Sequence, residues 1–485
     1  MSRRTHRIAM IAVVAIGLPA RDVPRAPRAT HAIVLLGGRV MDPESGLDAV
    51  RNVAIDGGRV TEITMAPLVG RDTIDAHGLV VAPGFIDLHQ HAQDSAGYAV
   101  EARDGTTTAL ELEEGPADVP PWYAARAGHA LINYGAGVGH VAVRMAVMHD
   151  TGVEAPVGPA RDSAATPAQI AEIRRRIEQG LDDGAVGVGF ILAWTRAARP
   201  WEVLEVFRAA AAHHASVHIH MRDVDDPEYF LDIEEAIAAA AATGAPLHVV
   251  HIASSALEDT PKYLDVIRGA RQRGLDVTTE CYPYDASMTT IESANPNWRD
   301  EPDSWFSRIE WPVTGERLTR ESFPRFLAMG GNFVIHNNTE AMVRAAVADS
   351  LTMIASDGIL DNGVGHPRVA GTFARVLGRY VRDEHALTLM MALRKMTLMP
   401  ARRLEARVPA MRRKGRVRIG DDADLVLFDP TTVADRATYR EPTLPPIGMP
   451  FVLVNGTVVV RNGRVVAGVA PGQAVRAPIR AGPGR

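Results

Sequence analysis

Two histidines, His89 and His91, stand at the end of the largely apolar run Phe85–Leu88. If this run is a β-strand, both imidazoles point to the same side, because side chains alternate faces along a strand. Neutral imidazoles that converge at a strand end suit a borderline metal such as zinc. A pair of surface histidines is the alternative reading, so a metal site requires further ligands elsewhere in the chain.

Two glutamates, Glu111 and Glu113, come next, in the segment Leu110–Gly115. In a strand they share one face and the leucines at 110 and 112 share the other. We expect the leucines to face surrounding helices and both glutamates to face the interior. Buried carboxylates are costly unless they are paired or bound to a cation. A salt-bridged structural pair is therefore the alternative to a metal role.

Later segments end in residues of the same chemical kind. His220 ends the run 217–220, with His218 two residues earlier as a candidate core histidine, and His251 follows Leu247–Val250. One such histidine is more often structural than a ligand. Four expected strand ends that supply His or Glu nevertheless predict a metal centre.

An aspartate, Asp357, follows the expected strand 351–355 and precedes Gly358. An aspartate there can accept a proton from a metal-bound water and later deliver it to a leaving group. A turn-forming Asp before Gly is the alternative. Its place at the last polar strand end favours the catalytic interpretation.

The elements that must position these residues alternate between strands and helices over about residues 81–405. This pattern predicts a parallel sheet closed by helices, and about eight strands match an α/β fold of the (β/α)8 TIM-barrel type, in which catalytic groups gather at the carboxyl ends of the strands. The expected strands after the first are 106–112, 185–192, 217–221, 247–252, 276–282, 333–335 and 352–355.

Both ends of the chain have a different texture, with short apolar runs broken by Gly and by Asn455-Gly456 and Asn462-Gly463, which are strong hairpin signals. We expect residues 31–80 and 406–475 to form one small β-sandwich domain, with the barrel inserted between its halves and a tail at 476–485. An insertion at about 295–326 carries Trp298, Trp305 and Trp311. These rings could line an aromatic acyl pocket, although packing of the loop is the commoner explanation.

Composition excludes some classes of function. The 485-residue chain has a formal net charge of −6 and no basic face that suggests nucleic acid, and its single cysteine, Cys281, excludes an internal disulfide. Residues 1–30 combine basic residues with a short apolar run, which predicts an export signal and a periplasmic or secreted protein. A disordered arm on a cytoplasmic protein is the alternative. The apolar run is too short for a stable membrane span, and the oligomeric state stays open, a homo-oligomer included.

Over about residues 31–470 the chain resembles the amidohydrolase superfamily and, within it, the N-acyl-D-amino-acid deacylase (D-aminoacylase) branch. The motifs that carry the resemblance are Pro-Gly-Phe-Ile-Asp-Leu-His-Gln-His (83–91), Asp-Gly-Thr-Thr-Thr (104–108), His-Met-Arg-Asp (220–223), His251, Tyr-Pro-Tyr (282–284), Ser-Asp-Gly (356–358), the segment 366–378 that begins His-Pro-Arg, Lys-Met-Thr (395–397) and the segment 420–430 that begins Gly-Asp-Asp-Ala-Asp.

The resemblance implies one or two zinc ions, or another divalent metal, held by histidines at 89, 91, 220 and 251, with Asp357 as general base. Two departures stand out. Many superfamily members carry a carbamylated lysine on the fourth strand, but residues 185–194 contain no lysine. The deacylase branch instead has a cysteine near the end of the second strand, where an ungapped match places Glu114. Strand parity favours Glu113, which we take as the bridging or sole acidic ligand.

The second departure concerns the substrate. Where the branch has a lysine that helps to hold the substrate carboxylate, this chain has Ala253, whereas Tyr282 and Arg368 match the other carboxylate-holding positions. Arg368 could instead be a structural ion-pair partner. A guanidinium can grip a carboxylate through two hydrogen bonds, so an amide with a nearby acid group remains the expected substrate.

The resemblance therefore implies a zinc-dependent amidohydrolase that cleaves a linear amide, an N-acyl amino acid above all, by attack of metal-bound hydroxide with Asp357 as base and then acid. The alternatives are a cyclic-amide hydrolase similar to hydantoinases and dihydroorotases, a dipeptidase, or, in another class, an inactive metal-binding scaffold.

Overall fold

The computed structural model describes residues 30–222, 230–293 and 297–480. It shows the mixed α/β fold that the sequence predicts. The expected export segment lies outside the described residues except for Thr30, which begins the first strand. Among the helices of the described ranges, none is long and apolar enough to cross a membrane.

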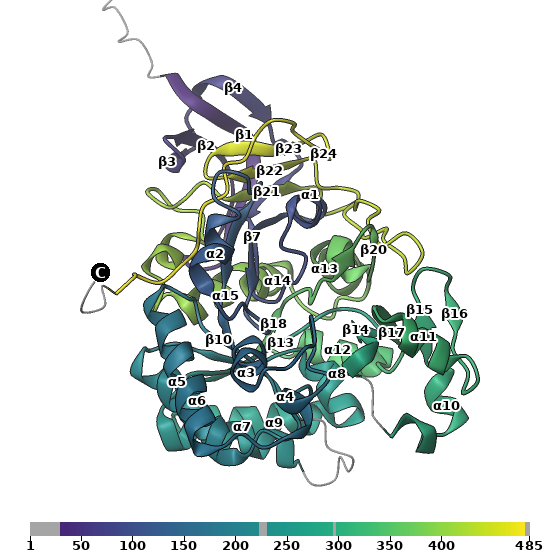
Figure 1. Ribbon diagram of the computed structural model, residues 1–485. Helices are drawn as coiled ribbons and strands as arrows, with labels where there is room; N and C mark the ends of the chain where they lie inside the picture. Colours follow the sequence, from purple (N-terminus) through teal and green to yellow (C-terminus); the bar gives the residue numbers. More distant parts are fainter. Residues whose placement is uncertain (1–29, 223–229, 294–296, 481–485) are drawn as a thin grey trace, which may run out of the picture.

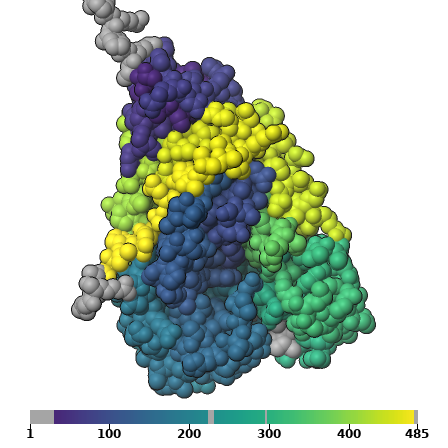
Figure 2. All heavy atoms as spheres, turned by 45° about the horizontal axis from the view of Figure 1, so that its top comes forward, coloured from purple at the N-terminus to yellow at the C-terminus, as the bar shows by residue number. Residues whose placement is uncertain are grey.

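A nine-stranded sheet combines the two ends of the chain. Its order is β24-β23-β22-β21-β5-β1-β2-β3, with β4 beside β1, so that β5 from the N-terminal part pairs with β21 from the C-terminal part. The purple and yellow segments accordingly lie side by side in Figures 1 and 2. The strands are β1 (Thr30–Asp42), β2 (Leu47–Asp56), β3 (Arg59–Thr64), β4 (Val69–Asp75), β5 (Val80–Pro83), β21 (Leu425–Phe428), β22 (Phe451–Val454), β23 (Thr457–Arg461) and β24 (Arg464–Val465).

The two Asn-Gly pairs form the turns that the sequence predicts. The φ values are 47° at Asn455 and 73° at Gly456, and 53° at Asn462 and 73° at Gly463. Positive φ at both central residues is what a two-residue hairpin turn requires. The turns join β22 to β23 and β23 to β24 in antiparallel register.

Parallel strands fill the middle of the chain, in two sheets. One has the order β6-β7-β8 and the other β9-β10-β11-β12-β13-β18. Gly137 alone separates β8 from β9, and the amide of Asp357, beyond β18, donates to the carbonyl of His89, beyond β6, at 2.7 Å. The strands are β6 (Phe85–Asp87), β7 (Thr106–Glu111), β8 (Asn133–Ala136), β9 (Val138–Gly139), β10 (Val188–Ile191), β11 (Val217–His220), β12 (Leu247–Val249), β13 (Val277–Cys281) and β18 (Thr352–Ile354).

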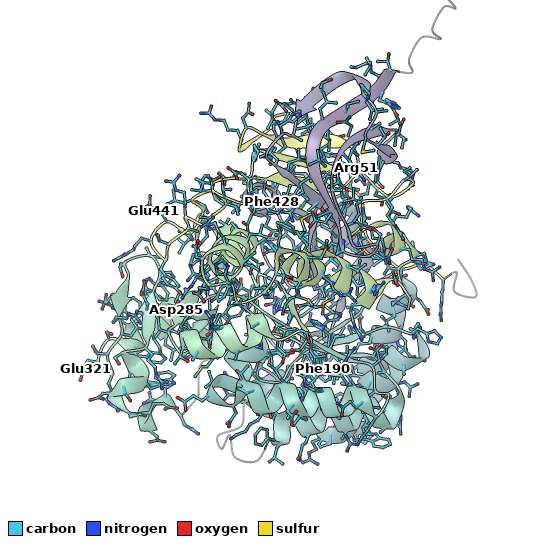
Figure 3. All side chains as sticks on the ribbon, turned by 180° about the vertical axis from the view of Figure 1, so that it is seen from behind. Arg51, Phe190, Asp285, Glu321, Phe428 and Glu441 are labelled. Atoms are coloured by element: carbon cyan, nitrogen blue, oxygen red, sulfur yellow. The ribbon has the colours of Figure 1, made fainter. Side chains whose placement is uncertain are left out.

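Helices cover these strands, and the hydrophobic core lies between the two layers. Phe190 of β10, labelled in Figure 3, is part of this core. Its ring packs against that of Phe207 of α6, with centroids 6.4 Å apart. The longer helices are α1 (Ser95–Arg103), α3 (His140–Met148), α5 (Pro167–Asp182), α6 (Pro200–Ala212), α7 (Leu231–Thr243), α9 (Thr260–Gln272), α12 (Glu340–Ala348) and α13 (Arg368–Arg375). The shorter ones are α2 (Val119–Ala124), α4 (Pro159–Asp162), α8 (Ile252–Ala256), α10 (Asp303–Phe306), α11 (Phe323–Met329), α14 (Leu389–Leu393) and α15 (Met399–Leu404).

One strand assignment from the sequence is wrong. Residues 333–335, expected among the parallel strands, belong to β17 (Asn332–Ile335), which runs antiparallel to β14 (Ser287–Thr290) and β15 (Ile309–Trp311). A three-residue apolar run carries no information about strand direction. The sequence reading missed two parallel strands, β8 and the two-residue β9. The Asn133-Tyr134-Gly135 sequence of β8 lacks the apolar pattern of its neighbours.

The expected insertion contributes to this antiparallel sheet, which also includes β16 (Glu316–Arg317). Its aromatic rings pack on one another in a separate hydrophobic cluster. Trp298 packs against Phe323, and Trp311 packs against Phe326, with ring centroids 5.1 and 4.8 Å apart. Packing, rather than an acyl pocket, is therefore the role that the described contacts give these tryptophans.

Candidate metal centre and active site

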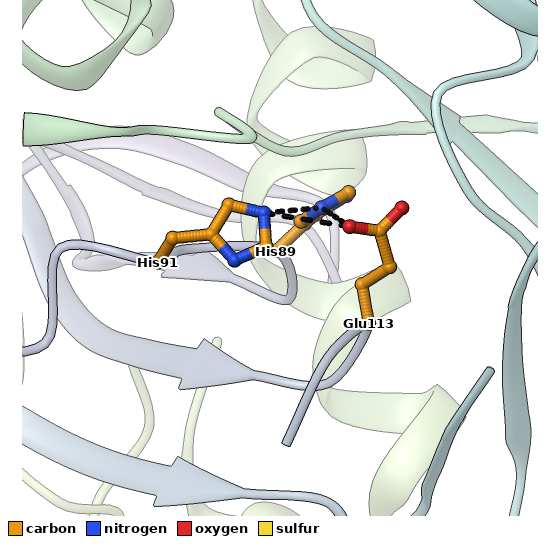
Figure 4. Close-up of side chains that lie close together, drawn as sticks. All are labelled: His89, His91 and Glu113. Atoms are coloured by element: carbon orange, nitrogen blue, oxygen red, sulfur yellow. Dashed lines mark hydrogen bonds and ion pairs between the residues drawn. The ribbon is translucent and has the colours of Figure 1, made fainter. Parts of the chain in front are cut away.

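The two histidines of the first parallel strand converge just after β6 ends. His89 Nε2 and His91 Nε2 lie 3.1 Å apart, although the strand itself stops at Asp87 (Figure 4). The buried Asp87 carboxylate accepts hydrogen bonds from the amides of His89 and Ser356, at 3.1 and 3.0 Å. It therefore fixes the turn that presents both imidazoles to the end of the sheet.

Glu113 lies between these histidines and a second pair. Its Oε2 is 3.0 Å from His89 Nε2 and 3.4 Å from His91 Nε2 (Figure 4). Its Oε1 is 3.0 Å from both His220 Nδ1 and His251 Nε2, which are 3.1 Å from each other. One carboxylate thus joins two histidine pairs that come from the ends of β6, β11 and β12.

The structure places Glu113 in the cluster, but this residue lies beyond the strand whose alternation favoured it. Leu110 and Leu112 pack with Ile86 and Leu88 and with α15 residues, in a cluster separate from the one between strands and helices. Since β7 ends at Glu111, strand alternation does not govern the direction of the Glu113 side chain. The turn beyond the strand end brings Glu113 over the histidines.

Glu111 and Glu114 lie on the other side of His91. Glu111 Oε2 is 2.8 Å from His91 Nδ1 and Glu114 Oε1 is 3.6 Å from the same nitrogen. Neither carboxylate has a recorded contact with the other three histidines. Glu113, rather than Glu114, is thus the glutamate at the centre of the four imidazoles.

The donor set fits a divalent cation. Burial alone lowers the pKa of His89, but Glu113 and Asp357 raise it, and the net pKa lies well above its usual value. His89, His220 and His251 hold the pKa of Glu113 well below its usual range although burial raises it. The cluster therefore favours positive charge at its centre, and metals compete with protons for such groups. Four imidazole nitrogens and a carboxylate are the ligand types that zinc takes.

Asp357 lies beside the first histidine pair. Its Oδ1 is 3.4 Å from His89 Nε2, 3.3 Å from His91 Nε2 and 2.8 Å from Arg368 Nη2. Burial raises the pKa of Asp357, but the positive charges of Arg368 and His89 lower it by more, so the net pKa is below its usual value. Its backbone has a φ of 51°, a left-handed conformation that is uncommon for residues other than glycine. The lowered pKa favours the ionised form of the carboxylate at neutral pH.

Arg368 and Tyr282 lie on the far side of Asp357. Arg368 is fully buried at the start of α13, and its guanidinium lies 4.5 Å from the centroid of the Tyr282 ring. The contact with Asp357 shows the ion pair that the sequence left as an alternative. However, Nε and Nη1 of Arg368 have no hydrogen-bond partner among the described residues. Buried donors of this kind are costly unless a ligand satisfies them.

Three other residues named from the sequence, His218, Cys281 and Ala253, are buried. His218 is buried and its Nε2 lies 2.9 Å from the Ser216 hydroxyl, so it is a core histidine. Burial raises the pKa of the Cys281 thiol to about 12, which leaves it neutral. Ala253 is buried next to the site, where it offers no charge.

The sequence reading missed Glu280 and His248. Glu280 Oε1 is 2.7 Å from His89 Nδ1, and Glu280 Oε2 is 3.1 Å from His248 Nε2. The available signal was a charged residue inside the largely buried strand β13, at the position before Cys281. A buried charge in a strand requires a partner, but the sequence does not say which one.

Comparison with known proteins agrees with this geometry. The model of the amidohydrolase family matches residues 72–466. N-acyl-D-glutamate deacylase of Alcaligenes xylosoxydans xylosoxydans is 31% identical over 477 residues, which cover 88% of this chain and 93% of that protein.

Two solved structures are similar over nearly the whole chain. N-acyl-D-glutamate deacylase from Bordetella bronchiseptica, complexed with zinc and a phosphonate mimic of the tetrahedral intermediate, is 28% identical with a TM-score of 0.81, covering 93% of this chain and 100% of the other. D-aminoacylase is 26% identical with a TM-score of 0.78, covering 92% of this chain and 100% of the other.

Proposed function

The chain belongs to the amidohydrolase family, and on that premise we propose that it is a metal-dependent hydrolase that cleaves the linear amide bond of an N-acyl amino acid. The observation that carries the proposal is the Glu113 carboxylate, whose two oxygens each lie 3.0 Å from a histidine of a different pair. The similar proteins are named N-acyl-D-glutamate deacylase and D-aminoacylase. These names indicate acylated amino acids as substrates, which supports the same substrate class here.

The metal would be zinc, as one or two ions. The residues that would hold it are His89, His91, Glu113, His220 and His251. When bound, such a cation supplies a Lewis acid for the scissile carbonyl and for the attacking water. The zinc in the similar deacylase structure supports this choice.

Asp357 acts as the general base and then as the general acid. It takes a proton from the attacking water, the hydroxide adds to the amide carbon, and the carbon–nitrogen bond breaks as Asp357 returns the proton to the departing amine. Arg368, 2.8 Å from Asp357 Oδ1, orients the carboxylate and keeps it ionised before the reaction.

Arg368 and Tyr282 would hold the acid group of the substrate. Nε and Nη1 of Arg368, which have no partner among the described residues, lie on different edges of the guanidinium. Each would donate a single hydrogen bond to a carboxylate oxygen. With Ala253 in place of a lysine, Arg368 would be the main cation for this group. The substrate therefore carries a carboxylate close to the scissile amide.

A comparison of matched substrates tests this assignment. The ratio of kcat/KM for an N-acyl amino acid to that for its carboxamide should be about 10–100, because the neutral amide leaves buried guanidinium donors unpaired. Arg368→Lys should bring the ratio toward 1, while Arg375→Lys, on the same helix, should preserve it. Replacing Arg368 also disturbs Asp357, but that disturbance slows both substrates alike and therefore cancels in the ratio of their kcat/KM values. A ratio near 1 in the unaltered enzyme would refute the carboxylate clamp.

Metal analysis with a panel of N-acyl amino acids tests the function as a whole. The purified protein should contain a divalent metal and release the free amine from members of the panel, and activity should follow metal content when a chelator removes the metal and zinc restores it. Metal-independent hydrolysis, or metal binding with no turnover of any panel member, would count against the proposal.

The alternatives fit less well. A cyclic-amide hydrolase, a dipeptidase and an inactive scaffold are not favoured. The deacylases are 31% and 28% identical over about nine-tenths of the chain, and the Asp357 carboxylate is in place beside the histidines.

We further propose that the two parallel sheets close into one (β/α)8 barrel over 81–405, with a β-sandwich domain from 31–80 and 406–475. Two observations support closure. Gly137, whose amide donates to the Glu111 carbonyl, directly joins β8 of one sheet to β9 of the other, and the Asp357 amide beyond β18 donates to the His89 carbonyl beyond β6. Export by the N-terminal segment also remains a proposal. Assembly into a homo-oligomer stays an open expectation from the sequence.

A further inference from the structure

A buried carboxylate links the first metal-site histidine to a second histidine deeper in the sheet. Glu280, on β13, is only 1% exposed, and each of its oxygens faces one imidazole. Oε1 is 2.7 Å from His89 Nδ1 and Oε2 is 3.1 Å from His248 Nε2. His248 is fully buried, and its Nδ1 lies 2.8 Å from the Thr278 hydroxyl.

The chemistry of these groups fixes where the hydrogens lie. An ionised carboxylate only accepts hydrogen bonds, so His89 Nδ1 and His248 Nε2 must both donate to Glu280. A neutral His248 then accepts at Nδ1 from the Thr278 hydroxyl at 2.8 Å, a shorter contact than the 3.3 Å from that hydroxyl to the Leu247 carbonyl. When a metal replaces the second proton of His89, the proton that remains on Nδ1 is held by Glu280, and Nε2 is left bare toward His91 and Glu113, as a metal ligand must be.

Two of the other histidines in the cluster, His91 and His251, have weaker supports. Glu111 lies 2.8 Å from His91 Nδ1, and the Ser255 hydroxyl lies 3.0 Å from His251 Nδ1. His91 is itself part-exposed, and a serine hydroxyl can donate as well as accept. Only the Glu280 support combines a full negative charge, near-complete burial and a second histidine that holds the carboxylate in place, among the residues described. Water cannot readily replace it.

We propose that Glu280, held by His248, is a positioning residue that fixes the orientation and tautomer of His89 and thereby sets the metal affinity of the His89–His91–Glu113 half of the cluster. This inference rests on the proposed function, in that it assumes that the cluster binds a divalent metal. Removing an outer partner of a metal-ligating histidine typically weakens metal binding about 10–100-fold, and we expect an effect of that size.

The test measures zinc affinity by competition with a chromophoric chelator, with no substrate present. Glu280→Gln should weaken zinc binding about 10–100-fold. His89 and His248 each need an acceptor, but the glutamine amide has one acceptor oxygen and turns its NH2 donor toward the other histidine. Glu280→Asp, which keeps the charge, should retain more affinity than Glu280→Gln. His248→Gln, whose side-chain amide can still donate to Glu280, should bind zinc more tightly than His248→Leu.

Asp104→Asn is the matched control. Asp104 is also a buried carboxylate with two hydrogen bonds, from the amides of Phe373 and Ala374 at 2.9 Å each. Its variant should lower the melting temperature of the metal-free protein and leave zinc affinity unchanged. If Glu280→Gln binds zinc as tightly as the unaltered chain, or if Asp104→Asn weakens binding by the same factor, the positioning role is wrong. An unaltered chain that binds no zinc would instead refute the proposed function.

Discussion

Replacing Asp357 with asparagine should lower kcat about 10²–10⁴-fold and leave the metal content of the protein unchanged. Asparagine has nearly the same shape, but it cannot take a proton from water or return one to the leaving amine. Asp357 Oδ1 lies 3.3–3.4 Å from the Nε2 atoms of His89 and His91, close enough to act on a water held among these residues. The four histidines and Glu113 remain, so the metal ligands survive the exchange.

The experiment pairs steady-state kinetics with elemental analysis of the same preparations. Asp361→Asn is the matched control, because Asp361 is an exposed aspartate on the short strand β19 (Leu360–Asp361), a few residues further along. It should behave like the unaltered enzyme. A fully active Asp357→Asn protein would remove Asp357 from the mechanism, and a metal-free one would make it a ligand instead of a base.

Exchanging Glu113 for glutamine should weaken metal binding by more than about 100-fold, the upper end of what loss of an outer partner does, and activity should fall with it. Among the described residues, the Glu113 carboxylate is the group whose recorded contacts reach both histidine pairs, at 3.0 Å from His89 and 3.0 Å from His251. A neutral side chain removes the negative charge that balances the cation, and its amide group turns a donor toward one imidazole pair.

Glu114→Gln is the internal comparison for this prediction, because the two glutamates are neighbours in the sequence. Glu114 approaches only His91 Nδ1, at 3.6 Å, on the side away from Glu113. Its variant should bind metal with nearly the affinity of the unaltered protein. Equal losses of metal affinity in the two variants, or a larger loss for Glu114→Gln, would contradict this prediction. The acidic ligand would then be Glu114, the residue that an ungapped match places there.

The sequence predicted the histidines and Asp357 because each stands where an apolar strand pattern ends. The carboxyl ends of parallel strands meet at one edge of a sheet, so strand position alone places these side chains together. The hairpins at Asn455-Gly456 and Asn462-Gly463 were equally predictable, since the turn type demands these residues.

What the sequence could not supply depends on packing across the molecule. Glu280 touches His89 across 191 positions of sequence, and no local pattern identifies such a partner. Alternation along β7 failed at Glu113 because the strand ends at Glu111. Residues 333–335 fit a strand of either direction, and only the neighbouring β14 and β15 make β17 antiparallel.

A crystal structure of the protein with its native metal, using anomalous scattering at the zinc edge, tests the central claim most directly. The account predicts metal density between the Nε2 atoms of His89 and His91, between His220 and His251, or at both places, with Glu113 coordinating in each case. Metal bound through Glu114 and Glu111 with Glu113 uninvolved, or no metal among the four histidines, would contradict it.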